Sequence, residues 1–436
     1  MQSESFHRSI EAQLERWKDS PSRQPLLLNG ARQVGKTYIL RKFGERRFGN
    51  VCYVNLELLF NVDDIFGGDI APAQLVRRLE VAAGERIVPG STLLILDEIQ
   101  SCERALTSLK YFCEMMPELH VAAAGSLLGV AINRKNYSFP VGKVHLLRLQ
   151  PLDFGEYLLA RGEETLAVLL CEHFQTLQPL PEAIHAKASS LYLEYLVTGG
   201  MPAAVGRFLE RGSLLDVAPR QLEILDSYIA DMAKYASPSE AVKIRACYES
   251  LPSQLAKENR KFQYKVVKKG GSASLFGAAI DWLEQAGVVL KCKRLDHAEI
   301  PLEAYANLSA FKLYMSDVGM LAMKSRLPAE TVLANQGNTF LGALAENYAA
   351  QQLAALGKPL YYWEGATAEV DFVLQLGASL ACAEIKKGVR TRSRSLSVFR
   401  QKYRPDICYR FSLKNFGNEN GVRAVPLYAM FCLGKG

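Results

Sequence analysis

Residues 30–37 have the types and spacing of a phosphate-binding loop. They read Gly30-Ala31-Arg32-Gln33-Val34-Gly35-Lys36-Thr37, which fits the pattern G-x-x-x-x-G-K-[ST]. The two glycines allow the backbone to turn so that successive N–H groups point at phosphate oxygens. Lys36 can reach the β- and γ-phosphates, and Thr37 offers a hydroxyl to Mg²⁺. The loop predicts a site for a nucleoside triphosphate with Mg²⁺; a glycine-rich turn without a ligand is the alternative.

Two carboxylates follow an apolar run further along the chain. Asp97 and Glu98 come directly after Thr92–Leu96, and a run that is apolar throughout is typical of a central parallel strand. At the end of such a strand, Asp97 could complete the Mg²⁺ shell, and Glu98 could orient or deprotonate the attacking water. Ser126, after the apolar run Val121–Ala124, is a candidate contact to the γ-phosphate. A serine that merely begins a turn is the alternative.

A second group of reactive residues lies in the last hundred positions. Asp371 falls on one predicted strand, and Glu384 and Lys386 fall on the next. The two-residue period of a strand places Glu384 and Lys386 on one face. Asp371 and Glu384 could then hold one Mg²⁺, Glu346 could add a carboxylate from a helix, and Lys386 could polarise water or phosphate. The pattern predicts a metal-dependent phosphodiester-cleaving site. A surface ion pair, or a fold used only for interaction, is the alternative.

Two segments concentrate positive charge. Residues 257–269 hold six basic residues against one acid, and residues 386–410 hold nine against one, whereas the whole chain has a net charge of +7. Clustered Lys and Arg are the electrostatic footprint of a phosphate backbone. DNA is therefore a candidate partner through both segments, and a solvated basic face is the alternative.

The elements that must position these residues follow from hydrophobic periodicity. Short apolar strands alternate with helical stretches up to about residue 150, which predicts an α/β fold with a parallel sheet and the ligand at the carboxyl ends of the strands. Residues 151–238 have a helical pattern and form a predicted bridge or lid. Between 239 and 330, helices precede an alternating strand at Gly287–Leu295, the order of a winged helix.

At this point the chain resembles a known family. The segments LLLNGARQVGKTYIL, LLILDEIQ and AAAGSLL look like an AAA-type P-loop ATPase. More narrowly, they resemble prokaryotic ATPases that carry a C-terminal domain related to restriction endonucleases. YLVTGGMPAAV (195–205) and FKLYMSDVGML (311–321) are similar to two further motifs of that family. The segment with Asp371 and Glu384-x-Lys386 resembles the PD-(D/E)XK nuclease core.

The resemblance implies four domains. We expect an ATPase core at 1–150, a helical bridge at 151–238, a winged-helix-like module at 239–330 and an α/β nuclease-like domain at 331–436. It also implies ATP rather than GTP. One departure concerns the position after Gly142, where the family commonly has Arg and this chain has Lys143. Lys is a point charge and lacks the bidentate geometry of Arg, so Arg134 and Arg148 are weaker candidates for an arginine finger.

Composition limits the class of protein. With 436 residues, 49% of them hydrophobic and 22% charged, the chain matches a globular protein of several domains. No signal peptide and no membrane span are expected. Nine cysteines without a Cys-x-x-Cys pair favour reduced thiols and a cytoplasmic location. The expected function is an Mg²⁺-dependent ATPase that couples nucleotide state to DNA binding or processing. The alternative is a nucleotide-dependent switch that docks a protein partner; a homo-oligomer is a further candidate.

Overall fold

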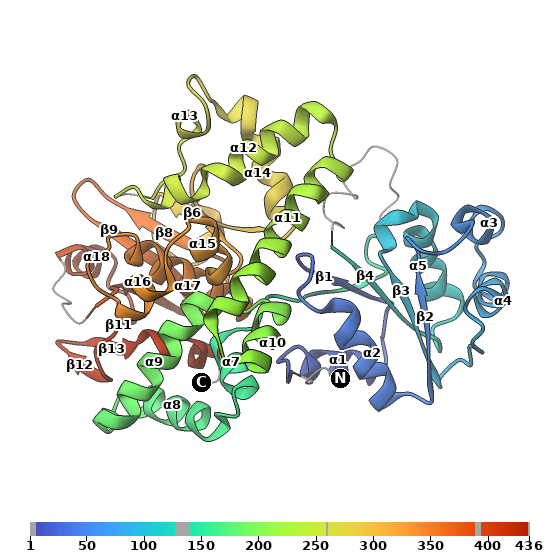
Figure 1. The fold of residues 1–436 in the computed structure, drawn as a ribbon, viewed down its shortest axis with the longest axis horizontal. Coiled ribbons are helices and arrows are strands. Elements are labelled where there is room, and N and C mark those ends of the chain that lie inside the picture. Colours follow the sequence, from blue (N-terminus) through green and yellow to red (C-terminus); the bar gives the residue numbers. More distant parts are fainter. Residues whose placement is uncertain (1–5, 127–139, 259, 389–393, 435–436) are drawn as a thin grey trace. The chain divides into compact units, whose positions relative to one another are not determined.

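The computed structural model describes residues 6–126, 140–258, 260–388 and 394–434. The chain divides into two compact units. The N-terminal unit comprises His7–Gln150 with Gln285–Gly287, and the C-terminal unit comprises Pro151–Glu284 and Val288–Gly436 with Met1–Phe6. Figure 1 shows the elements of both units along the chain. Among the described residues, no helix is both long and apolar enough to cross a membrane.

The N-terminal unit is built on a parallel sheet of five strands in the order β2-β3-β4-β1-β5. Its strands are β1 (Leu26–Asn29), β2 (Asn50–Asn55), β3 (Thr92–Asp97), β4 (His120–Gly125) and β5 (His145–Arg148). Every residue of β3 and β4 is buried, because helices cover both faces of the sheet. The continuous apolar runs of these two strands follow from that double covering, as the sequence predicted.

Helices pack on both faces of this sheet. They are α1 (Glu11–Lys18), α2 (Lys36–Arg47), α3 (Val62–Gly67), α4 (Pro72–Ala83) and α5 (Glu103–Met115), with a 3-10 turn η1 (Ile99–Ser101). Leu94 and Leu96 of β3 join a core with α4 and α5. The other face meets α2, where a Cβ on Gly44 would lie 3.1 Å from the Leu93 side chain. Beside α1, the ring of His120 lies edge-on to the rings of Trp17 and Phe48.

The C-terminal unit begins with a run of helices. They are α7 (Phe154–Ala160), α8 (Glu164–Thr176), α9 (Glu182–Thr198), α10 (Pro202–Arg211), α11 (Val217–Tyr235), α12 (Pro238–Leu255), α13 (Tyr264–Val267) and α14 (Ala273–Gln285), with η2 (Leu214–Asp216). Phe154, Tyr192 and Tyr195 pack edge-on against Tyr348 of a later helix. The predicted helical bridge therefore shares an aromatic core with the last hundred residues.

A mixed sheet of eight strands forms the rest of this unit, in the order β12-β13-β11-β10-β9-β8-β6-β7. The strands are β6 (Val289–Leu295), β7 (Ala306–Met315), β8 (Tyr361–Glu364), β9 (Glu369–Leu376), β10 (Ser379–Ile385), β11 (Ile407–Ser412), β12 (Gly417–Glu419) and β13 (Val422–Pro426). The helical segments are α15 (Val318–Lys324), α16 (Ala329–Ala334), α17 (Leu341–Ala355), α18 (Arg394–Tyr403), η3 (Leu302–Tyr305) and η4 (Leu427–Gly434).

The hairpin predicted as part of a winged helix belongs to this larger sheet. Three helices, α12 to α14, precede the antiparallel pair β6–β7, which is the predicted order. Parallel pairing of β6 with β8 then joins the hairpin to the strands at 361–426. The boundary proposed at residue 330 thus falls inside one compact unit, and the finer domain division remains a prediction.

A buried polar contact explains why two of the quoted motifs occur together. Asp317 accepts hydrogen bonds from the backbone N–H groups of Gly200 (2.6 Å) and Met320 (2.9 Å). A Cβ on Gly319 would lie 2.6 Å from the backbone nitrogen of Gly199, so the glycines allow the two chain segments to touch. Gln351 of α17 donates to the same carboxylate at 3.3 Å. The motifs at 195–205 and 311–321 therefore form one packing joint.

Candidate functional site

The loop between β1 and α2 has the backbone geometry that its glycines predict. Gly30 has φ +153°, and a Cβ there would lie 2.3 Å from the carbonyl oxygen of Leu149. Gly35 has φ +95°, a conformation that a side chain would disfavour. The side chain of Asn29 accepts the Gly30 N–H at 2.7 Å. The loop therefore ends where α2 begins, and the dipole of this helix favours an anion at its amino end.

Lys36 is folded over this loop. Its Nζ donates to the carbonyl oxygens of Gly30 (2.8 Å) and Ala31 (2.9 Å), and the residue is buried. Arg8 contributes from outside the motif, donating to the carbonyl oxygen of Val34 at 3.2 Å and to that of Gln150 at 2.6 Å. The positive charges of Lys36 and Arg8 thus lie on the phosphate-binding loop itself.

Asp97, at the carboxyl end of β3, meets the end of this loop. Its Oδ2 accepts from Thr37 Oγ1 at 2.7 Å and from the Tyr53 hydroxyl at 2.9 Å. Burial, together with the bond to Asp97, raises the pKa of Tyr53 to about 12, so Tyr53 stays a donor. A hydroxyl and a carboxylate side by side are oxygen donors of the kind that Mg²⁺ takes. These residues fit that ion.

Glu98 and Ser126 complete the carboxyl edge of the sheet. Glu98 has φ +52°, and its carboxylate accepts a hydrogen bond from the side chain of Gln100. Ser126 follows β4 and is buried. Parallel pairing of β4 with both β3 and β1 places Ser126 at the same edge as Asp97 and the loop. The predicted site residues of the N-terminal unit are therefore brought together.

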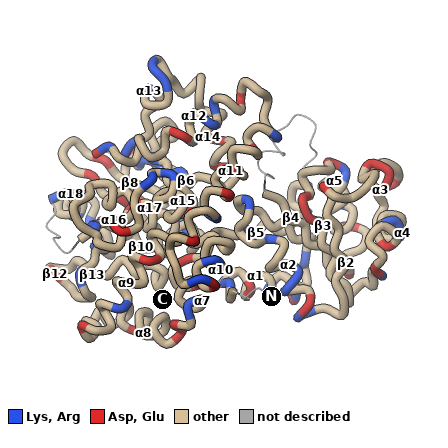
Figure 2. The backbone as a smooth tube through the Cα atoms, viewed as in Figure 1, with Lys and Arg blue, Asp and Glu red and all other residues tan. Residues whose placement is uncertain are grey.

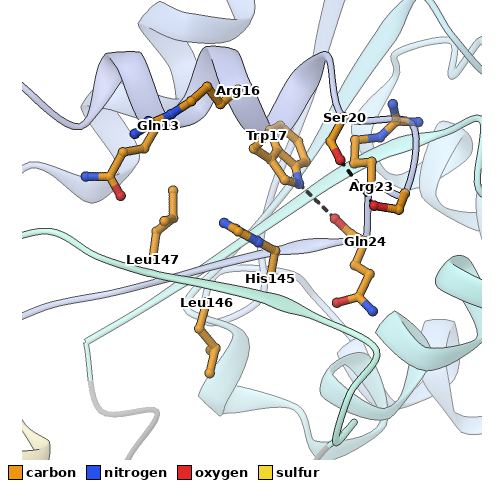
Figure 3. A pocket seen from close by; sticks show the side chains of 10 residues that line it. Gln13, Arg16, Trp17, Ser20, Arg23, Gln24, His145, Leu146 and Leu147 are labelled. Carbon is orange, nitrogen blue, oxygen red and sulfur yellow. Dashed lines mark hydrogen bonds between the residues drawn. The ribbon is translucent and has the colours of Figure 1, made fainter. Parts of the chain in front are cut away.

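A separate cavity of about 710 Å³ lies between α1 and β5 in the same unit. Figure 3 shows Trp17 and Arg16 from α1 facing His145 and Leu147 of β5. The indole N–H of Trp17 donates to the carbonyl oxygen of Gln24 at 2.8 Å. Gln24 precedes β1 and His145 begins β5, so this cavity opens near the amino ends of the strands. The phosphate-binding loop lies at the opposite ends.

The residues predicted to form a metal site in the C-terminal unit are not all brought together. The described residues contain no group of three His, Cys, Asp or Glu side chains arranged to hold a metal ion. Asp371 Oδ2 accepts the backbone N–H of Ile385 at 2.7 Å. Glu384 contacts Lys386 Nζ and Arg410 Nε, each at 3.3 Å. Glu346 therefore does not join Asp371 and Glu384 in one group of metal ligands, and the expected Mg²⁺ site of Asp371 and Glu384 remains a prediction.

The strand pattern gives the physical reason. Glu384 shares a face of β10 with Cys382, which packs with Phe399 of α18. Glu346 comes from α17 and bonds Tyr314, whose ring meets Phe372. Phe372 and Cys382 point to opposite faces of the sheet, because Phe372 pairs with Ala383 and side chains alternate. The close contact of Lys386 with Glu384 agrees with the predicted shared face.

Glu346 belongs instead to a buried ionic cluster that the sequence did not reveal. Its Oε1 accepts from Lys312 Nζ at 2.9 Å and from the Tyr314 hydroxyl, and its Oε2 pairs with Arg260. Lys312 also contacts Glu369 Oε1 at 2.5 Å. Lys312 and Tyr314 lie in the quoted motif FKLYMSDVGML, which was the available signal. Their acidic partners lie 32 to 57 residues away, and no local spacing identifies them.

Comparison with protein families finds a match over the N-terminal site. Residues 22–158 match the model of the AAA domain. This segment is similar to an AAA domain and is called the AAA domain below, after the model that it matches. Its phosphate-binding loop, Asp97 and Ser126 all fall within the matched residues. Residues 189–331 and 341–430 match two domains of unknown function, DUF8612 and DUF4143 respectively. A search of curated proteins found no match.

Solved structures give distant likenesses. A Walker-type ATPase of Pyrococcus abyssi is 16% identical, with a TM-score of 0.44, covering 74% of this chain and 97% of its own. The Aeropyrum pernix ORC1 protein in complex with DNA is 15% identical, with a TM-score of 0.30 and coverages of 75% and 94%. The Thermotoga maritima RuvB Holliday junction branch migration motor is 14% identical, with a TM-score of 0.27 and coverages of 63% and 84%. Because every TM-score is below 0.5, these likenesses do not identify a function.

Three residues were considered as a possible arginine finger for the AAA domain. Lys143, which stands where the resembling family has Arg, forms an ion pair with Glu114 at 3.0 Å. Arg148 ends β5 and is exposed. Arg134 lies outside the described residues. A finger residue for the AAA domain therefore remains unassigned.

Proposed function

We propose that the AAA domain binds and hydrolyses ATP with Mg²⁺. The observation that carries the proposal is the 2.7 Å contact between Thr37 Oγ1 and Asp97 Oδ2, which joins the phosphate-binding loop to the end of β3. Loop N–H groups and Lys36 hold the phosphates, and Thr37 and Asp97 hold Mg²⁺, which neutralises phosphate charge when bound. Glu98 orients and deprotonates water, and Ser126 contacts the terminal phosphate. The preference for ATP rests on the family resemblance.

Two substitutions test this assignment. Lys36→Ala should abolish ATP binding, whereas Glu98→Gln should keep binding and slow hydrolysis by about 10²–10⁴-fold, the usual contribution of a general base. Both are measured as phosphate release and nucleotide affinity at saturating Mg²⁺. Lys110→Ala and Glu118→Gln, exposed positions of the same unit, are matched controls. Wild-type hydrolysis rates in both site variants would refute the proposal.

A second function, DNA backbone binding, is favoured by α13 and its flanks. Lys265, Lys268 and Lys269 are exposed, and no carboxylate in the described part of the chain pairs with them. By contrast, Arg260 and Lys261 of the same segment pair with Glu346 and Glu364. Figure 2 marks the basic residues around α13 and places α18 in a separate part of the unit. The basic surface available to DNA therefore includes fewer residues than the two basic segments, 257–269 and 386–410, contain.

The second segment is largely used within the unit. Lys386 and Arg410 pair with Glu384, and Lys387 donates to the carbonyl oxygen of Asn338. Lys402 lies over the rings of Trp363 and Tyr403. Arg390 and Arg392 lie outside the described residues. These contacts favour α13 as the phosphate-binding surface.

A salt series tests DNA binding. Each phosphate contact adds about 0.9 to the slope of log affinity against log salt. Replacing Lys265, Lys268 and Lys269 together by Ala should lower that slope by about 2–3. The double variant Lys402→Ala/Arg404→Ala should leave it unchanged. A slope that responds only to the double variant would move the surface to α18. Absence of salt-sensitive binding in wild type would favour the alternative function, a nucleotide-dependent switch that docks a protein partner.

A further inference from the structure

The ammonium group of Lys312 lies between two carboxylates. Its Nζ is 2.9 Å from Glu346 Oε1 and 2.5 Å from Glu369 Oε1. Three separate elements supply these groups: β7, α17 and β9. Lys312 has a relative exposure of 0%, and its Nζ lies 4.9 Å from the centre of the Tyr362 ring. A buried ammonium group therefore bridges a buried carboxylate, Glu346, and a partly exposed one, Glu369.

Two further groups face the Glu346 carboxylate. The Tyr314 hydroxyl donates to Oε1, and the Arg260 guanidinium pairs with Oε2. Arg260 and Lys312 together balance the charges of Glu346 and Glu369. A carboxylate buried without such a partner carries a large desolvation penalty, so the two cations account for how both acids are held within the unit.

The remaining acidic groups of the predicted nuclease site are engaged too. Asp371 accepts a backbone N–H, and Glu384 holds Lys386 and Arg410. A divalent cation needs several carboxylate oxygens directed at one point. In the described residues these oxygens are directed at Lys312, Arg260, Arg410 and a peptide N–H. The oxygens of Glu346 and Glu369, which face Lys312 and Arg260, therefore do not fit Mg²⁺.

We infer that Lys312 is the built-in cation of the Glu346–Glu369 pair, lying between the two carboxylates at the point where a divalent metal would have to bind them. The pair consequently binds no Mg²⁺ in the wild-type chain. With Lys312, it holds β7, α17 and β9 together. The inference concerns the C-terminal unit alone and is independent of ATP hydrolysis.

Removing the lysine should convert the cluster into a metal site. In Lys312→Ala, Glu346 and Glu369 lose their shared cation but keep their places on α17 and β9. Divalent ions bind such carboxylate pairs, and binding to the folded state raises the midpoint of thermal unfolding. We therefore expect Mn²⁺ to raise the midpoint of this variant by several degrees. Wild type should show no such shift.

The experiment uses the full chain without nucleotide in an Asp97→Asn background, which removes the metal ligand of the AAA domain. Bound Mn²⁺ is counted by electron paramagnetic resonance, and unfolding is followed with MnCl₂ or with EDTA. Lys312→Ala should bind about one Mn²⁺ per chain. Adding Glu369→Gln should abolish that binding. Lys324→Ala is the matched control, since the Lys324 side chain is also largely buried, over Tyr248, and its one carboxylate partner among the described residues is Glu249.

Each outcome decides the question. Mn²⁺ binding that appears in Lys312→Ala, disappears with Glu369→Gln and is absent from Lys324→Ala supports the inference. The wild-type measurement stays decisive if Lys312→Ala fails to fold. Wild-type binding of Mn²⁺ that is lost in Glu346→Gln or in Glu369→Gln would overturn the inference. A folded Lys312→Ala protein that binds no Mn²⁺ would overturn it as well.

Discussion

At the scale of single residues, His120 shows how burial changes chemistry. It begins β4 and lies edge-on to Trp17 and Phe48. Burial, with a smaller contribution from the nearby charge of Arg23, lowers the pKa of His120 to about 4. The folded unit therefore holds the neutral imidazole, whereas the unfolded chain protonates it at the ordinary pKa of 6.5.

Because this pKa is lowered on folding, the stability contributed by neutral His120 is present above pH 6.5 and is lost as the pH falls toward 4. The loss should amount to about 2–3 kcal/mol. His120→Phe keeps an aromatic ring and removes the titration, so its N-terminal unit should lose less stability between pH 7 and pH 4. Urea unfolding at the two pH values measures the difference. An equal loss in wild type and variant would contradict the assignment.

The role of a residue could be predicted where the residues that act together are close in the sequence. Gly30, Gly35, Lys36 and Thr37 lie within one loop, so their spacing alone predicted the phosphate site. The contacts of Arg8 and Tyr53 with this site were not predicted, because tertiary packing brings both residues to it. The sequence around each of them contains no motif that indicates such a role. Lys312 was quoted only as part of a motif, because its role depends on Glu346 and Glu369, which strand order and helix packing bring to it.

At the scale of elements, glycines set how closely α9 and α15 approach. Gly199 follows α9 with φ +73°, and a Cβ there would lie 2.2 Å from Asp317 Oδ1. Gly319, within α15, touches the backbone of Gly199. The sequence identified Gly199 and Gly200 only as part of the motif YLVTGGMPAAV. Its partner segment could not be predicted, because the contact spans more than a hundred residues.

Gly319→Ala tests this joint. The added methyl group would overlap the Gly199 backbone, so we expect a loss of about 1–3 kcal/mol in the free energy of unfolding. Gly277→Ala in α14 is the control, because it is also helical and meets nothing within 4 Å. It should stabilise by roughly 0.5–1 kcal/mol through helix propensity. Denaturant unfolding measures both, and a neutral Gly319→Ala would show that the joint adapts.

At the scale of the whole molecule, the sequence predicted the parallel sheet of the AAA domain, because its central strands β3 and β4 are short runs that are buried throughout. It did not predict that β6–β7 extends the C-terminal sheet. Edge pairing depends on which strands meet, and the alternating pattern of Val289–Leu295 is equally compatible with a free hairpin. The segments expected to be three modules, residues 151–238, 239–330 and 331–436, therefore form one unit that is joined by a common sheet and an aromatic core.

The two units should respond oppositely to pH. Burial raises the pKa of Asp317, in the C-terminal unit, from 3.8 to about 6. Stability from its neutral form is complete below pH 3.8 and is lost as the pH rises through 6, by about 3 kcal/mol. The N-terminal unit instead gains stability over this range through His120.

Asp317→Asn cannot ionise, so the C-terminal unit of this variant should lack the loss between pH 4 and pH 7. The unfolding free energy of that unit, wild type minus variant, is the quantity to measure at each pH. Asn also places an NH₂ group against the N–H donors of Gly200 and Met320, so the variant should be less stable than wild type at pH 4. A difference that is the same at both pH values would exclude Asp317 as the titrating group.

The edge-on contact of Trp17 with His120 also makes the N-terminal unit optically distinct. Trp17 is the single indole of the N-terminal unit, while Trp282 and Trp363 belong to the C-terminal unit. A protonated imidazole quenches a neighbouring indole, so Trp17 emission should dim when His120 takes up a proton. With Trp282 and Trp363 replaced by Phe, the intrinsic fluorescence would follow the unfolding of the N-terminal unit alone. The same emission would report proton uptake by His120 without an added label.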